Sequence, residues 1–255
     1  MHRQSSWQAQ RATWVSRSVL GRLRVRFVEG RAGDVKATEL GYSSCGWWRL
    51  EMAKTILALT LFLAADPAFA HHAMDGAMPT TFWHGLLSGL GHPVIGLDHL
   101  AAIVAIGCLA AAQPKGALLA AGYVIATVIG AAAHIGEATV PNAEIFVALS
   151  VVALGLIVFR KDPLRRDLAF ALFVAAGLIN GYALGETIAG AERTPILAYF
   201  IGLAAIQTAI ALAIMSGVRM LIERASLQLL AMRVIGAFAV GAGAAILLQR
   251  YATGA

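Results

Sequence analysis

The chain has 255 residues, of which 59% are hydrophobic and only 13% are charged. Soluble globular domains carry roughly 25% charged residues, so this composition excludes an ordinary soluble domain. The formal net charge of +6 comes mostly from residues 1–51, which hold nine Lys or Arg against four acids, so nucleic acid is not an expected partner. With only two cysteines, Cys45 and Cys108, a disulfide framework and a CxxC metal site are also excluded.

The N-terminal part differs from everything that follows it. Residues 1–51 are rich in Arg and show no sustained hydrophobic periodicity. Met52 then opens a signal-like segment, with a charged start, a short apolar run and an Ala-x-Ala cleavage site at 68–70. We therefore expect 1–51 to be a non-native upstream extension, 52–70 a cleaved signal peptide and 71–255 the mature membrane domain. The alternatives are an Arg-rich targeting peptide at the start and an uncleaved first transmembrane helix after it.

Six apolar runs follow, each close to the ~20 residues that an α-helix needs to cross a bilayer. They predict an all-α, polytopic membrane protein with six transmembrane helices after the signal peptide. Gly and Ala are abundant in these runs, and small residues let helices approach closely in lipid. The expected spans are 94–112, 116–136, 143–159, 168–187, 195–217 and 233–249.

Loop charge predicts the orientation, because cytoplasmic loops carry an excess of Lys and Arg. A cleaved signal peptide would leave the mature N-terminus outside, and the loops would then alternate. The basic residues that fall on the predicted inner side are Lys115, Arg160, Lys161, Arg165, Arg166, Arg219, Arg224 and Arg233. The predicted outer loops carry mainly acids. We therefore expect a multi-pass protein of the bacterial inner membrane whose mature N- and C-termini are both periplasmic.

Histidines concentrate near the first span, since six of the seven lie between residues 71 and 134. The densest group is His92, Asp98 and His99. If one helix runs from Pro93, the two histidines are two turns apart and project from one face. Imidazole suits nickel, cobalt, zinc and copper, and a neighbouring carboxylate can coordinate or orient the ring. The group predicts a divalent-metal site at a helix mouth, and the alternative is a set of helix-start and interface residues.

The residues His-Pro-x-x-Gly-x-Asp-His at 92–99 resemble the signature of the HupE/UreJ family, whose members are implicated in nickel uptake for hydrogenase and urease. The segments 140–144 and 148–155 resemble the entrance of the third helix in that family. The resemblance covers most of 71–255 and does not extend to 1–51. It implies a six-helix membrane protein with nickel, or else cobalt, as its transported substrate.

The second histidine motif of that family, His-Gly-x-Ala-His-Gly-x-Glu, is altered here. Residues 180–186 read Asn-Gly-Tyr-Ala-Leu-Gly-Glu, so the glycines and Glu186 remain. Asn180 and Leu184 stand at the two histidine positions. Asparagine is a poor nickel ligand compared with imidazole, and leucine is none at all.

Other side chains are candidate substitutes. His134 and Glu137 share one helix face by their spacing, and with Glu186 they could complete a cluster of ligands from three helices. A loop-edge His and a solvated Glu are the alternative. His71 and His72 would stand at the mature N-terminus, where a free amine beside two imidazoles can capture Ni²⁺; a solvated linker is the alternative.

Together these features predict a transporter, not an enzyme, that takes up a divalent metal ion, nickel or cobalt, for metalloenzyme maturation. Two alternatives stay open: a metal-binding accessory or sensor membrane protein without transport, and a metal-dependent intramembrane enzyme. Against the enzyme, the sequence contains no HExxH motif. The expected partners are the metal ion and the lipid bilayer, and a homo-oligomer is left open.

Overall fold

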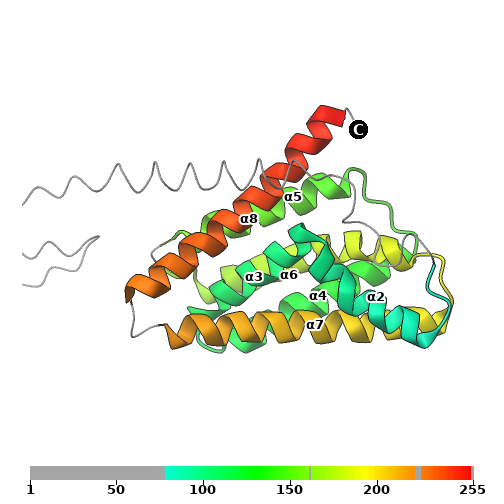
Figure 1. Cartoon of the computed structure of the whole chain (residues 1–255), viewed down its shortest axis with the longest axis horizontal. Coiled ribbons are helices and arrows are strands. Elements are labelled where there is room, and N and C mark those ends of the chain that lie inside the picture. The colour runs from blue at the N-terminus through cyan, green and yellow to red at the C-terminus, as the bar shows by residue number, and fades with distance from the viewer. Residues whose placement is uncertain (1–77, 161, 222–224, 254–255) are drawn as a thin grey trace, which may run out of the picture. The chain divides into compact units, whose positions relative to one another are not determined.

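The computed structural model describes residues 78–160, 162–221 and 225–253, and within these ranges the chain forms helices and no strand (Figure 1). This confirms the all-α class for the described residues. The expected extension, the signal peptide, His71 and His72 lie outside them. The elements are α2 (Phe82–Ile95), α3 (Leu97–Ala111), α4 (Gly116–Ile135), α5 (Ala143–Val158), α6 (Arg166–Gly185), the 3-10 turn η1 (Glu186–Ile188), α7 (Arg193–Met220) and α8 (Ala225–Thr253).

Four of these helices are long and apolar enough to cross a membrane: α4, α6 with η1, α7 and α8. The pair α2 and α3 passes the same test only when taken together, as one span bent by 78°. The remaining helix, α5, is apolar but has only 16 residues. The described part of the chain therefore holds four candidate spans, or five when the bent pair counts as one, as in a multi-pass membrane protein.

The run expected at 94–112 corresponds largely to α3, but its expected start is wrong, because residues 94 and 95 belong to a separate helix, α2, and the two helices meet at Gly96. The first one, α2, begins after Thr81, whose side chain accepts a hydrogen bond of 3.1 Å from a backbone N–H of the first turn. Pro93 was expected to start a helix, but it lies in the last turn of α2. At Gly96 the backbone turns to φ −71° and ψ 102°, and its N–H closes α2 on the carbonyl of His92.

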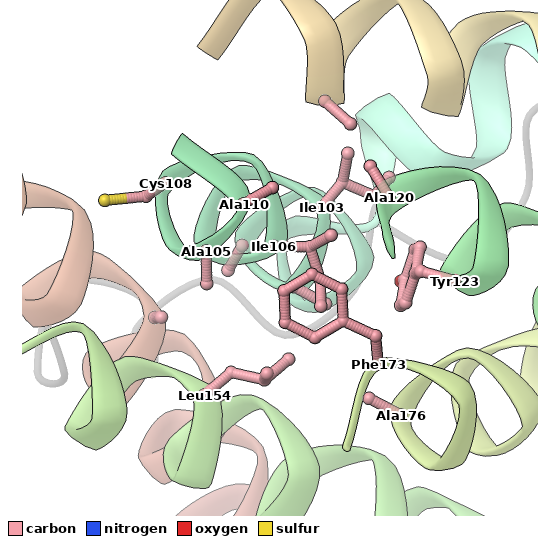
Figure 2. Packing of buried hydrophobic residues seen from close by; sticks show 14 of the residues in the cluster. Ile103, Ala105, Ile106, Cys108, Ala110, Ala120, Tyr123, Leu154, Phe173 and Ala176 are labelled. Atoms are coloured by element: carbon pink, nitrogen blue, oxygen red, sulfur yellow. The ribbon is translucent and has the colours of Figure 1, made fainter. Parts of the chain in front are cut away.

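Helix α3 lies at the centre of the bundle and packs against α4, α5, α7 and α8 (Figure 2). Lipid tails provide no hydrophobic drive between helices, so close packing of small side chains holds such a bundle together. The residues of α3 that are completely buried are Ala101, Ala102, Ile103, Ala105, Ile106 and Ala110. The middle of α3 is therefore enclosed by the surrounding helices.

The other helices pack most extensively in three pairs, α4 with α6, α2 with α7, and α5 with α8. Glycines bring α4 and α6 into backbone contact. A Cβ atom on Gly177 would lie 2.5 Å from the carbonyl oxygen of Tyr123, and one on Gly181 would lie 2.0 Å from that of Thr127. Residue numbers rise together along this contact, so α4 and α6 run parallel, and their C-termini reach the same end of the bundle.

Hydrogen bonds tie the connections together at one end of the bundle. Arg219, in the last turn of α7, donates to the carbonyls of Ala111 and Gln113, both at 3.2 Å. The side chain of Gln113 in turn donates to Leu164 O at 2.9 Å. We call this the basic end, because its described residues include Lys115, Arg160, Arg165, Arg166 and Arg219.

At the opposite end, Tyr182 holds the α4–α5 connection. Its hydroxyl donates to Ala138 O at 2.8 Å and accepts from Val140 N at 2.9 Å. Arg250, near the end of α8, donates to the carboxylate of Glu144 at the start of α5. We call this the acidic end, because it carries Glu137, Glu144, Glu186 and Glu192.

Candidate metal site

The break at Gly96 brings two histidines together from different helices. His92 lies in the last turn of α2 and His99 in the first turn of α3, and their ring centroids are 5.9 Å apart with planes tilted by 42°. The expected arrangement on one face of a continuous helix is therefore wrong, and the bend produces the proximity instead. Both residues are buried, with 7% and 6% of their surface exposed. We call this place the histidine joint.

Asp98 adds a carboxylate to the histidine joint. Its Oδ2 lies 3.8 Å from Nε2 of His99, and its side chain is 17% exposed. In the first turn of α3 the carboxylate is also stabilised by the positive end of the helix dipole. Gly96 makes room for this approach, since a Cβ atom there would lie 2.9 Å from His99 Cδ2 and 3.2 Å from Asp98 Oδ1.

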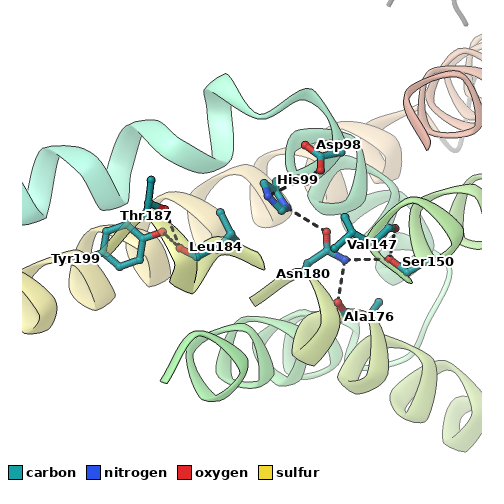
Figure 3. Close-up of polar contacts among 9 residues, drawn as sticks. All are labelled: Asp98, His99, Val147, Ser150, Ala176, Asn180, Leu184, Thr187 and Tyr199. Carbon is teal, nitrogen blue, oxygen red and sulfur yellow. Dashed lines mark hydrogen bonds and ion pairs between the residues drawn. The ribbon is translucent and has the colours of Figure 1, made fainter. Parts of the chain in front are cut away.

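Asn180 of α6 connects the histidine joint to the neighbouring helices (Figure 3). This residue is completely buried. Its Nδ2 donates to Ala176 O at 2.9 Å and to Ser150 Oγ at 3.0 Å, and its Oδ1 lies 3.2 Å from Nδ1 of His99. The hydroxyl of Ser150 donates onward to Val147 O at 2.7 Å. The chain of hydrogen bonds therefore joins α3, α5 and α6.

This chain of hydrogen bonds fixes the position of the proton on His99. A carbonyl oxygen can only accept, so the amide nitrogen of Asn180 faces Ala176 and its oxygen faces the ring. Nδ1 of His99 must then carry the proton, which leaves the lone pair of the neutral ring on Nε2. Nε2 is the nitrogen beside Asp98. Asn180 thus orients His99 for metal binding, as carbonyl partners of metal-binding histidines do.

The other predicted ligands lie elsewhere. His134, in the last turn of α4, packs on the ring of Tyr182 at a centroid distance of 4.6 Å, and its Nδ1 is buried without a hydrogen-bond partner. Glu137 is exposed just after α4, with a φ of +64°, and Glu186 is exposed in η1. Across the described ranges, no three His, Cys, Asp or Glu side chains stand close enough together to hold a metal ion. Binding would therefore require the side chains of the histidine joint to close on the ion.

Leu184, at the second altered histidine position, is completely buried. It belongs to an apolar cluster with Ala131, Ile188, Tyr199 and Leu203. The hydroxyl of Tyr199 donates to the backbone carbonyl of Leu184 at 2.6 Å. Leu184 therefore contributes to apolar packing, whereas Asn180 makes a polar contact with the histidine joint.

A comparison with known protein families bears on the resemblance seen in the sequence. The chain matches the family model described as HupE / UreJ protein over residues 59–246. The chain belongs to the HupE/UreJ family. This confirms the resemblance inferred from residues 92–99.

A curated relative extends this finding. Protein HupE of Rhizobium leguminosarum bv. viciae is 30% identical over 131 residues, which are 51% of this chain and 66% of that protein. The chain thus matches slightly less than two thirds of the length of this HupE/UreJ relative. No solved structure matches the chain.

Replacing Asn180 with leucine is expected to weaken Ni²⁺ binding by about 10–100-fold, the usual loss when the orienting partner of a metal-binding histidine is removed. Leucine has a similar size but cannot accept the Nδ1–H bond of His99, so the ring is free to change tautomer. Titration calorimetry with NiCl₂ measures the affinity, and ¹⁵N NMR of histidine-labelled protein reads the tautomer.

Ser150→Ala is the matched control, since it keeps the bond between Asn180 and His99 and should change both readouts much less. Parental affinity together with a parental tautomer in folded Asn180→Leu protein would show that His99 is oriented by something else.

Proposed function

We propose that this protein takes up a divalent transition metal ion, nickel or else cobalt, across the bacterial inner membrane for metalloenzyme maturation. The observation that carries the proposal is the histidine joint, where two buried imidazoles and a carboxylate meet at a broken helix. Ionisable groups inside a membrane are costly and mark ion pathways. Imidazole nitrogen and carboxylate oxygen are donors that suit these ions, and membership of the HupE/UreJ family adds the link to nickel.

The proposal includes six membrane crossings after a cleaved signal peptide at 52–70. The bent pair α2–α3 is the first crossing and the short helix α5 is the third. Positively charged loops stay in the cytoplasm, so the basic end faces inward and the acidic end faces the periplasm. Both ends of the mature chain are then periplasmic. The histidine joint lies at the start of α3, nearer the periplasmic side.

In the proposed mechanism, cations gather at the acidic end, where His71 and His72 would form a first capture point. The ion then exchanges water for His92, Asp98 and His99. His134, Glu137 and Glu186 would join the ligand set when the helices close on the ion. Ligands must be deprotonated, so binding weakens in acid. Release occurs toward the basic end, driven by an ion gradient or the membrane potential.

A second candidate function is metal binding without transport, as in an accessory or sensor protein. One observation favours it. Leu184 fills an apolar cluster at a position where the family pattern has a histidine, so this chain has fewer imidazoles along the helices than that pattern implies. Binding of Ni²⁺ by the purified protein, without accumulation in cells, separates this candidate from a transporter.

The test of the proposed function is uptake of ⁶³Ni²⁺ by cells that lack their own nickel importers and express the chain from Met52. We expect accumulation above cells without the gene, and reduced accumulation when unlabelled Co²⁺ is added. Excess Mg²⁺, which prefers oxygen ligands, should not compete. No accumulation, with a known importer as positive control and the protein present in the membrane, would overturn the nickel-uptake proposal.

A further inference from the structure

Among the residues that the structure describes, two completely buried polar side chains have atoms that make no hydrogen bond. These are Tyr123 of α4, through its hydroxyl, and Gln207 of α7, through both atoms of its amide. Buried polar groups in proteins are almost always paired, and in the middle of a membrane no bulk water is present to satisfy them. A tyrosine and a glutamine that are left unpaired in the bundle core therefore require an explanation.

Gln207 lies about one helical turn from the histidine joint, on the side of the basic end. A Cβ atom on Gly107 of α3 would touch Ala211 O, so α3 and α7 are level at these residues. One turn back along each helix, Gln207 is level with Ile103. Ile103 itself follows His99 by one turn. Since α3 and α7 run parallel here, Gln207 lies about one turn nearer the basic end than His99 does.

Tyr123 occupies the same level on another helix. Gly177 of α6 is in backbone contact with Tyr123, and Asn180, which bonds His99, lies almost one turn nearer the acidic end. Figure 2 shows the Tyr123 side chain beside the central helix. Helices α3, α4 and α7 all pack against one another, so both unpaired groups belong to one three-helix junction.

The neighbouring hydroxyl of Thr127 does not complete a hydrogen bond to the phenol, although the two groups interact. Thr127 is completely buried one turn along α4, and its proton is donated to the backbone carbonyl of Tyr123 at 2.9 Å, so it can offer the phenol a lone pair but no proton. The phenol and the amide offer two neutral oxygens and three N–H or O–H donors. Such groups bind a transition metal more weakly than imidazole, and they can also hold the water molecules of a hydrated ion.

We propose that Tyr123 and Gln207 form an inner transit position, which receives the cation with part of its water shell after it leaves the histidine joint. The inference rests on the proposed uptake function and adds a second position to it. Conduction requires sites that bind well enough for the ion to enter and weakly enough for it to leave. The neutral oxygens of Tyr123 and Gln207 meet that requirement, because they lie nearer the basic end than the histidine joint and hold the ion less tightly than its two imidazoles and carboxylate do.

The test compares Tyr123→Phe and Gln207→Leu with the parent in two assays. In the ⁶³Ni²⁺ uptake assay, at equal membrane abundance, each variant should lower the initial rate by about tenfold, the usual effect of losing one hydrogen bond or contact to a charged group. In titration calorimetry of the purified protein, the affinity for Ni²⁺ should stay within about twofold of the parent, because the histidine joint is intact. Both substitutions replace an unpaired polar group with an apolar one of similar size, so the melting temperature should not fall.

Tyr199→Phe is the matched control. Tyr199 is as deeply buried as Tyr123, but its hydroxyl donates to Leu184 O at 2.6 Å. This variant should lower the melting temperature and keep the parental uptake rate per molecule, which is the opposite of the pattern expected for Tyr123→Phe.

Three results would overturn the proposal in different ways. Parental uptake rates in Tyr123→Phe and Gln207→Leu would show that the two groups hold static water only. An equal loss of Ni²⁺ affinity and uptake rate would show that Tyr123 and Gln207 help to position the histidine joint and do not form a separate transit position. A parent that binds Ni²⁺ but does not accumulate it would remove the uptake function, and the transit position with it.

Discussion

Replacing His99 with alanine is expected to reduce ⁶³Ni²⁺ uptake to the level of cells without the gene. His99 is the buried ring whose Nε2 lone pair is oriented by Asn180 beside the Asp98 carboxylate. Removing a ligand should cost more than removing its orienting partner, for which the loss is about 10–100-fold. Initial uptake rates at equal membrane abundance measure the effect, and a melting curve of the purified variant checks that the bundle is folded.

The matched control for this experiment is His84→Ala. His84 lies in the first turn of α2, toward the acidic end, and its ring contacts only the exposed Thr80, at 3.4 Å, among the hydrogen bonds of the described part of the chain. It takes no part in the histidine joint, so uptake should stay parental. Persistent uptake by the His99→Ala variant would remove His99 from the transport site, whatever the His84 control shows.

Gly181→Ala is expected to destabilise the whole bundle. The added Cβ would lie 2.0 Å from Thr127 O and 2.7 Å from its Cα, so α6 must move away from α4 by about 1 Å before the contact becomes acceptable. Overpacking of this kind costs about 1–3 kcal/mol, occasionally more. The neighbouring Asn180 would move with α6, so nickel affinity should fall together with the melting temperature.

Gly217→Ala tests the same substitution where space is free. Gly217 lies in α7 with no atom within 4 Å of the added Cβ, and it is exposed. Alanine is a better helix former than glycine by up to about 1 kcal/mol, so this variant should be as stable as the parent or more stable. If both variants melt at the parental temperature, the close contact between α4 and α6 does not limit stability.

The positions of several helices could be predicted from the sequence because particular residue types mark where these helices begin and end. The spans expected at 116–136 and 168–187 agree with α4 and α6 to within two residues, since Pro and charged residues flank both apolar runs. Helix α7 (Arg193–Met220) exceeds the run at 195–217 by two or three residues at each end, whereas α8 (Ala225–Thr253) begins eight residues before the run at 233–249 and ends four residues after it. Hydropathy marks the part of a helix that suits hydrocarbon, but backbone hydrogen bonds continue into polar sequence.

The bend between α2 and α3 could not be predicted in this way. Pro is tolerated at the first turn of a helix and also close to its end, so Pro93 allows two interpretations. The residues on either side of Gly96, Ile95 and Leu97, are apolar, so hydropathy does not mark the break at this residue. Which interpretation is right depends on packing, because α2 lies against the first half of α7 while α3 enters the centre of the bundle.

The candidate site was predictable in its residues but not in its geometry. Spacing alone pointed to His92, Asp98 and His99. The hydrogen bond between His99 and Asn180 joins residues 81 positions apart, and no local pattern reveals such a pair. The usable signal was the presence of Asn180 and Ser150 in apolar helices, where a polar side chain needs a partner. Tyr123 and Gln207 carry the same signal, and their hydroxyl and amide groups make no hydrogen bond within the described part of the chain.

If the proposed function holds, the 78° bend at Gly96 has a mechanical consequence for ion selection. The two imidazoles are carried by separate helices, α2 and α3, so a cation bound by both would link the two helices across the bend. Each ion has its own preferred ligand distances and angles, and a bound ion that adopts them would change the angle between α2 and α3. Discrimination between ions with similar donor preferences would then depend on the elastic energy of a few backbone torsions, and not on the donor atoms alone.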